Sequence, residues 1–260
     1  MARGPRATLP RTRLPPPSSV LAEFVLRPRS GTTAGAAAPA GGRQYRILRT
    51  LERDEYDPPV QPAEIRAMGA PRAAPMDNAF RGTSRKAAKL SIAQAQMEAF
   101  ADVKGLIGTL VAHNTMKKKP NLSTAKTNNR VKEERRNVRV TAFLYAASVE
   151  GDNDYHLIVG RDPGKPETYM TVEISGLPPN NSPHFGKLKE ARDAYFGFFG
   201  DGLPGTSYDF YDPPIPVEIE GSLFFDMSHA TGSRPGPSKL RPKMPVVWEI
   251  HPVTRIIFEP

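Results

Sequence analysis

The sequence has 260 residues, of which 38% are hydrophobic, and it carries a net charge of +9 without a single cysteine. The missing cysteines exclude disulfides, thiolate metal sites and cysteine nucleophiles. Residues 1–136 hold 25 of the 36 Lys and Arg, whereas residues 137–260 hold 16 of the 27 Asp and Glu. The basic character therefore belongs to the first part of the chain, and the second part is mildly acidic.

Residues 1–83 are rich in Pro, Ala, Gly and Arg, and no apolar period survives across these residues. They are predicted to form a disordered arm, in which only Gln44–Leu51 has the pattern of a segment that orders against a partner. The N-terminus shows no apolar leader, and no apolar run is long enough to span a membrane. We therefore expect a cytoplasmic protein that makes no membrane contact.

Residues 84–114 are predicted to form one amphipathic helix, because apolar residues recur at spacings of three, four or seven. Residues 115–136 are predicted to be a basic linker, in which phosphate binding is the minority interpretation because stacking aromatics are missing. An isolated helix needs a packing surface, either the C-terminal domain or another chain. The candidate partner-binding residues are Leu90, Met97, Phe100, Ile107, Lys117, Lys118 and Lys119.

From residue 137 the pattern changes to β-strands separated by turns, with one helix. The expected strands are Val138–Val149, Tyr155–Val159, Tyr169–Ile174, Pro216–Asp226 and Val246–Phe258, and the helix Lys187–Phe199 lies between the third and fourth. This order is that of the OB-fold, a five-stranded barrel. The fold prediction is therefore mainly β, an OB-like barrel over residues 137–260, with a split β-sandwich as the alternative.

Successive side chains of a strand face opposite ways, so the apolar residues of each expected strand define an inner face. Opposite that face lie His156, Glu173, Glu249 and His251, which we expect to share one outward-facing surface. Imidazoles and carboxylates together are the ingredients of an acid–base pair or a divalent metal site. The candidate catalytic residues are His156, Glu173, Glu249 and His251, and the candidate metal ligands are His156, Asp226, His229 and His251.

The alternative interpretation is that these residues have only a structural role. An out-facing Glu on a strand is usually solvated or ion-paired, and Pro252 after His251 ends a hydrogen-bond ladder because proline has no N–H. No nucleophile elbow, phosphate-binding loop or dinucleotide fingerprint is present in the sequence. We therefore expect no cofactor, and an enzyme is the less favoured class.

Three strand motifs together carry a resemblance. They are His156-Leu157, the strand ending Leu223-Phe-Phe-Asp226, and Trp248-Glu-Ile-His-Pro-Val253. Residues 137–260 thereby resemble a family of uncharacterised bacterial domains with an OB-like β-barrel. The resemblance implies a domain boundary near residue 137 and the out-facing His and Glu set, and it implies no activity.

These features favour a non-enzymatic assembly or interaction protein, in which the arm and helix bind a protein partner or large assembly and the barrel is a binding or structural module. One alternative is a nucleic-acid-associated protein acting through the basic arm. Another is a metal-dependent phosphodiester hydrolase built on His156, Glu173, Glu249 and His251. A barrel face that anchors a peptide or sugar is a further possibility.

Overall fold

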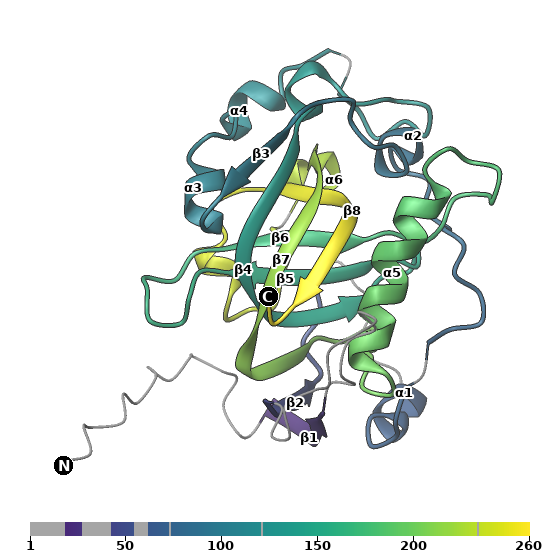
Figure 1. Cartoon of the computed structure of the whole chain (residues 1–260), viewed down its shortest axis with the longest axis vertical. Helices are drawn as coiled ribbons and strands as arrows, with labels where there is room; N and C mark the ends of the chain where they lie inside the picture. Colours follow the sequence, from purple (N-terminus) through teal and green to yellow (C-terminus); the bar gives the residue numbers. More distant parts are fainter. Residues whose placement is uncertain (1–18, 28–42, 55–61, 73, 121, 233) are drawn as a thin grey trace.

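The computed structural model describes residues 19–27, 43–54, 62–72, 74–120, 122–232 and 234–260, and within them the fold is mainly β (Figure 1). The strands are β1 Val20–Leu26, β2 Tyr45–Thr50, β3 Met97–Phe100, β4 Asn137–Val149, β5 Tyr155–Gly160, β6 Tyr169–Ile174, β7 Asp209–Phe225 and β8 Trp248–Phe258. The α-helices are α1 Pro62–Ala67, α2 Lys86–Lys89, α3 Val103–Ile107, α4 His113–Met116, α5 Phe185–Phe199 and α6 Met227–Thr231. Two 3₁₀ turns, η2 Lys132–Glu134 and η3 Arg241–Lys243, complete these elements.

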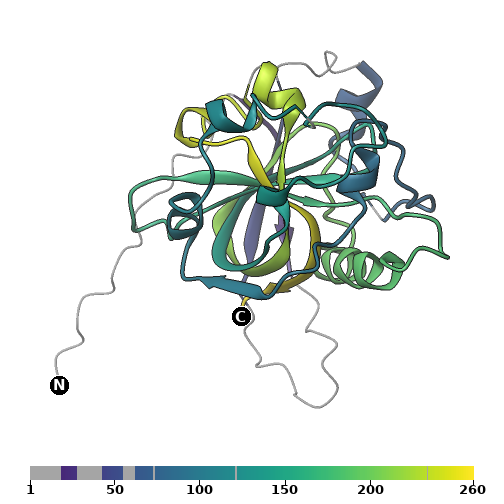
Figure 2. The same cartoon turned by 90° about the horizontal axis from the view of Figure 1, so that it is seen from above.

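All eight strands belong to one sheet with the order β1-β2-β7-β8-β6-β5-β4-β3, and β7 also pairs with β4. The five strands expected after residue 137 are β4 to β8, and the expected neighbour order of the last four, β5-β6-β8-β7, is confirmed. The expected helix between the third and fourth of these strands is α5, which runs along the outside of the curved strands (Figure 2).

The OB-like barrel of five strands is wrong as a description of the sheet, because β1, β2 and β3 extend it to eight. Strand β2 pairs antiparallel with the start of β7, so that Ile47 lies opposite Tyr211, and β1 pairs with the outer side of β2. Strand β3 pairs parallel with β4. The sequence did not predict these pairings, because a proline- and glycine-rich segment separates β1 from β2 and both are far from β7 in sequence.

The disordered arm over residues 1–83 needs correction, since residues 20–26 and 45–50 are strands and residues 62–67 are helical. The part of this prediction that falls on residues 1–18, 28–42 and 55–61 lies outside the described residues. Within 43–54, Arg49 is buried and donates to the carbonyls of Met68 and Ala70. Residues 43–54 are therefore part of the folded structure.

The single helix over residues 84–114 is also wrong: α2, β3, α3 and the start of α4 occupy this stretch. Asp102 caps α3 by accepting a hydrogen bond from Gly105 N at 2.9 Å, so a new helix begins there. The apolar spacing arose because each short element buries its own residues, such as Val103 and Leu106 in α3. A shared helical face is not needed to explain the spacing.

The basic linker over residues 115–136 is wrong for its second half, where Arg130 and Glu134 are buried. The guanidinium of Arg130 donates to the backbone oxygens of Ala88, Ser91 and His251 at distances of 2.7–2.9 Å. Segments far apart in sequence are thus held together by one side chain.

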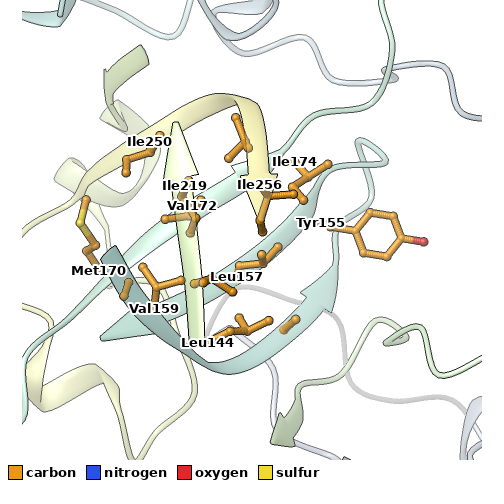
Figure 3. Close-up of a cluster of buried hydrophobic side chains, with 14 of the residues drawn as sticks. Leu144, Tyr155, Leu157, Val159, Met170, Val172, Ile174, Ile219, Ile250 and Ile256 are labelled. Carbon is orange, nitrogen blue, oxygen red and sulfur yellow. The ribbon is translucent and has the colours of Figure 1, made fainter. Parts of the chain in front are cut away.

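The apolar core lies between the curved strands β4 to β8. Figure 3 shows Leu157, Val159, Val172, Ile219 and Ile250 pointing toward one another, whereas the Tyr155 ring points away toward Tyr195 of α5. The expected inner faces are confirmed, because these side chains and Trp248 belong to one hydrophobic core cluster. Trp248 also donates from Nε1 to the Val111 oxygen at 2.9 Å.

Gly221 marks the bend expected in the fourth of these strands. The pairing of β7 with β8 shifts register on both sides of Gly221. A Cβ at this position would lie 2.5 Å from the Pro252 oxygen and 2.6 Å from an Ile250 methyl group. Only glycine lets β8 approach β7 this closely.

Candidate functional site

The second face of β5, β6 and β8 carries polar residues, and the structure brings the four predicted catalytic residues close together there. His156 pairs with Glu173 across β5 and β6, and Thr171 pairs with Glu249 across β6 and β8. Since side chains alternate along each strand, His251 falls beside Glu173. The alternation of apolar residues was enough to place these four on one face.

The expectation that this face points to solvent is wrong, because the four side chains are 0–2% exposed. Residues 77–91 cover it: Phe80 N donates to Leu177 O and Arg81 N donates to Asp152 O, both at 2.9 Å. The turn of Lys86–Lys89 then places the Lys89 side chain against Glu173. Residues 77–91, which were expected to belong to the arm and to the start of the amphipathic helix, therefore close the site.

The centre of the site is a group of acidic residues around His251 and Lys89. His251 Nδ1 contacts Glu173 Oε2 and lies 3.7 Å from Glu249 Oε2, while Nε2 lies 3.5 Å from Asp154 Oδ2. Lys89 Nζ lies 3.5 Å from Glu173 Oε2 and 3.6 Å from Asp154 Oδ2. We call Lys89, Asp154, Glu173, Glu249 and His251 the buried acidic group.

Hydrogen bonding within the buried acidic group is incomplete. Asp154 Oδ1 accepts from Gly176 N at 2.6 Å, and Ser175 Oγ lies 2.9 Å from His251 Nε2. In contrast, Asp154 Oδ2 and both carboxyl oxygens of Glu249 have no hydrogen-bond partner among the described residues. Buried polar atoms without partners are costly, so these three oxygens are the least satisfied atoms of the group.

The charges of the buried acidic group follow from burial and from Lys89. Burial, reinforced by Asp152, raises the pKa of Asp154 well above its usual value, and burial together with Glu173 does the same for the pKa of Glu249. Burial alone would also raise the pKa of Glu173, but Lys89 and His251 outweigh it and hold that pKa well below its usual value. Burial therefore favours the neutral forms of Asp154 and Glu249, whereas Lys89 and His251 favour the ionised form of Glu173.

A second group, Asp54, Glu150 and His156, lies next to the first. His156 Nδ1 lies 2.5 Å from Glu150 Oε1 and 3.5 Å from Asp54 Oδ2, and Nε2 lies 3.2 Å from Thr171 Oγ1. Burial lowers the pKa of His156, but the carboxylates of Glu150 and Asp54 prevail and raise it to about 10. His156 is thus an imidazolium in an ion pair, with both ring nitrogens engaged.

Asp226 and His229, the remaining predicted metal ligands, belong to neither group. Asp226 caps α6 by accepting from Ser228 N at 2.6 Å and His229 N at 3.4 Å. His229 Nε2 lies 3.6 Å from Asp226 Oδ2. Their proximity is explained by helix capping.

The predicted partner-binding residues do not form one exposed face. Of the four apolar residues, Leu90 is buried, Phe100 and Ile107 pack against the core, and Met97 is exposed, at 41%. Lys117 and Lys118 are exposed, whereas Lys119 pairs with Glu133.

A different exposed apolar surface lies on β1. Leu21 is 45% exposed and Val25 is 56% exposed, with the exposed Glu23 between them on the same side of the strand. Strand β1 pairs only with β2 among the described residues, and these two strands lie at the end of the molecule opposite α2, α3 and α4 (Figure 1).

A surface pocket near the second group does not open onto the buried acidic group. Its lining includes Met68, Arg81, Glu150 and Tyr155, and none of Glu173, Glu249 or His251 belongs to it. With its side chains buried, the buried acidic group can hold an ion or a proton, but it does not meet a substrate from solution in this structure.

Sequence reasoning missed Lys89, Glu150 and Asp54 as members of these groups. Asp154 had a usable signal, because it lies on the same side of its strand as His156. Lys89 carried no local signal, since its contacts are with residues more than 60 positions later in the chain.

Comparison of the chain with known protein families, curated proteins and solved structures found no match. The resemblance to uncharacterised bacterial domains therefore stays a prediction from sequence. Among the helices that the structure describes, none has the length and apolar character to cross a membrane.

Proposed function

We propose that this chain is a non-enzymatic binding protein whose partner is another protein, and that the partner adds an extended segment to the outer edge of β1. The observation that supports this is the open edge: within the described residues, no strand pairs with the outer side of β1. An edge strand offers a row of backbone donors and acceptors to an incoming chain.

The side chains of β1 suit such a partner. Proteins usually protect an edge strand with lysine, proline or a very short length. Strand β1 is seven residues long, has neither lysine nor proline, and exposes Leu21 and Val25. Its exposed charge is Glu23, which lies 3.6 Å from Arg46.

The charge of Glu23 disfavours a second copy of this chain as the occupant. Antiparallel pairing of two β1 strands about their centre would place Glu23 opposite Glu23, and like charges directly opposite each other destabilise a sheet. A partner segment with a basic residue between two apolar residues, each two positions away, would instead complement Glu23 and contact Leu21 and Val25.

The alternatives have less support. A phosphodiester hydrolase at His156, Glu173, Glu249 and His251 needs substrate access, and these side chains are 0–2% exposed. Nucleic-acid binding by residues 84–136 is weakened because Arg85, Lys89 and Arg130 are buried in ion pairs or hydrogen bonds.

The test is peptide binding to the full chain. Two nine-residue extended peptides would carry Val at positions three and seven and differ only at position five, which is Lys in one and Glu in the other. We expect the Lys peptide to bind about fivefold more tightly, from about 1 kcal/mol for the cross-strand charge pair. Fluorescence anisotropy of labelled peptides measures both affinities.

Variants of the chain locate the binding edge. Val25→Lys places a charge on β1 and is expected to weaken the Lys peptide about tenfold. Met97→Lys makes the same kind of change on the other edge strand, β3, and is the matched control that leaves binding unchanged. Equal binding by wild type and Val25→Lys, or a wild-type homodimer that Val25→Lys dissociates, would contradict a peptide-like partner on β1.

A further inference from the structure

We propose that Asp154, Glu173, Glu249 and His251 form a buried binding site for a divalent transition-metal cation, of the Zn²⁺ or Mn²⁺ class, independently of the partner surface on β1. One oxygen or nitrogen atom from each of Asp154, Glu173 and His251 lies within 4.8 Å of the other two. Glu249 Oε2 adds a fourth potential ligand 3.7 Å from His251 Nδ1.

The second observation is the set of unpartnered atoms inside this group. Both oxygens of Glu249 and Asp154 Oδ2 make no hydrogen bond among the described residues, and both side chains are 0% exposed. These atoms belong to the residues that would coordinate the ion. A cation between them would satisfy several lone pairs at once, which no single hydrogen bond does.

The surroundings of His251 fit metal coordination. A metal-bound histidine usually donates its other ring N–H to a nearby oxygen, which fixes its tautomer. With Nδ1 directed at the carboxylates, Nε2 is free to donate to Ser175 Oγ at 2.9 Å. The ring is also held from the side by Phe224, whose centroid is 5.4 Å away.

The ligand set selects the class of ion. Three carboxylates and one imidazole give mixed oxygen and nitrogen ligands, which suit Zn²⁺ or Mn²⁺. Ca²⁺ requires six to eight oxygens, and Mg²⁺ keeps several waters, so a buried site with a histidine fits both poorly.

Lys89 supplies the positive charge that this site holds at present. Its ammonium lies 3.2–3.6 Å from Asp152, Asp154 and Glu173. It is also the member of the buried acidic group nearest to solvent, at 7% exposure. A divalent ion would repel the ammonium, and Lys89 would then move toward Asp152, which is the more exposed of its partners.

The experiment uses the full chain, freed of metal by a chelator and then titrated separately with ZnCl₂ and MnCl₂. Calorimetry gives stoichiometry and affinity, and the Glu249→Gln variant locates the ion at this site. We expect one ion per chain and a melting temperature that rises with the ion. CaCl₂ and MgCl₂ should bind at least tenfold more weakly.

Three variants give the result its specificity. Glu249→Gln keeps the shape of the side chain and should weaken binding about 100-fold, because loss of even an outer-shell partner typically costs 10–100-fold. In chelator its melting temperature should equal or exceed that of wild type, since the replaced carboxyl has no hydrogen bond to lose. Lys89→Met removes the competing cation and should tighten binding about tenfold. Asp209→Asn changes a buried carboxyl outside the site and should bind as wild type does.

Failure of the wild-type chain to bind Zn²⁺ or Mn²⁺ saturably at one ion per chain would overturn the proposal. So would binding that is unchanged in Glu249→Gln, because the ion would then sit on the surface. A Glu249→Gln chain that melts well below wild type in chelator would show that the carboxyl has a structural role instead.

Discussion

Strand β6 separates two buried regions of opposite chemistry. On one face Met170, Val172 and Ile174 join the apolar core. On the other, Thr171 contacts His156 and Glu173 belongs to the buried acidic group. All six residues of the strand are buried. The apolar face is closed by strands adjacent in the sheet, whereas the polar face is closed by a segment some 80 residues earlier in the chain. Alternation along a strand therefore identifies a face but does not say whether solvent reaches it.

The largest expected effect lies on the apolar side. Trp248→Ala should lower the free energy of unfolding by about 3–5 kcal/mol, because it empties a buried ring site and breaks the hydrogen bond to Val111 O. Urea unfolding followed by far-ultraviolet circular dichroism measures the loss. A loss below about 1 kcal/mol would show that the core does not depend on this ring.

A similar loss in the free energy of unfolding is expected from the Arg85–Glu134 pair, which holds the segment that covers the polar face of the sheet. Glu134 accepts from both terminal nitrogens of Arg85, at 2.6 and 2.7 Å, and both side chains are fully buried. Glu134→Gln leaves the guanidinium without its counter-charge and should cost about 3–5 kcal/mol.

The matched control for Glu134→Gln is Arg139→Ala, which breaks a pair with Glu220 whose arginine is 44% exposed. This control should cost at most about 1 kcal/mol. Equal losses for the two variants in urea unfolding would mean that the cover over the polar face is not closed.

A third effect of similar size, visible as a dependence on pH, is expected at Asp209. Burial, against the opposing effect of Arg49 and Arg72, raises the pKa of Asp209 from 3.8 to about 7. The folded state therefore holds a proton that the unfolded state releases, so stability is greatest below pH 4 for this group and falls as the pH rises to 7. The full loss is on the order of 4 kcal/mol, at about 1.4 kcal/mol per pKa unit.

Asp209→Asn removes this titration. The stability of the variant relative to wild type should therefore improve steadily between pH 4 and pH 7 and stay constant above it. Urea unfolding of both proteins at a series of pH values gives the difference, in which the other titrating groups cancel. A flat difference across this range would show that Asp209 has an ordinary pKa in the folded protein.

Much of the C-terminal half of the fold could be predicted because its signals are local. Alternating apolar residues placed Leu157, Val172 and Ile250 inside, and the same alternation placed Glu173 and His251 together on the other face. The neighbour order of β5, β6, β8 and β7 followed from the expected OB-like order of the strands. These inferences needed no information on the rest of the chain.

The earlier half could not be predicted because its partners are distant in sequence. Arg85, Lys89 and Arg130 resembled solvated basic residues, yet Arg130 donates to a carbonyl 121 positions away and Arg85 pairs with an acid 49 positions away. Gln44–Leu51, which contains β2, had the pattern of a segment that orders against a partner, but nothing local indicated that its neighbours are β1 and β7. The expected domain boundary at residue 137 was inferred without knowledge of these distant contacts. It stays a prediction.

The most direct test compares the full chain with a fragment of residues 137–260 by urea unfolding and Trp248 fluorescence. The contacts of residues 77–136 with the later strands predict that the full chain unfolds cooperatively with a buried tryptophan. The fragment, which lacks Lys89, Arg130 and Val111, should show a solvent-exposed emission and no cooperative transition. A fragment that unfolds with the same midpoint and the same buried emission as the full chain would contradict the conclusion that the earlier segment completes the domain.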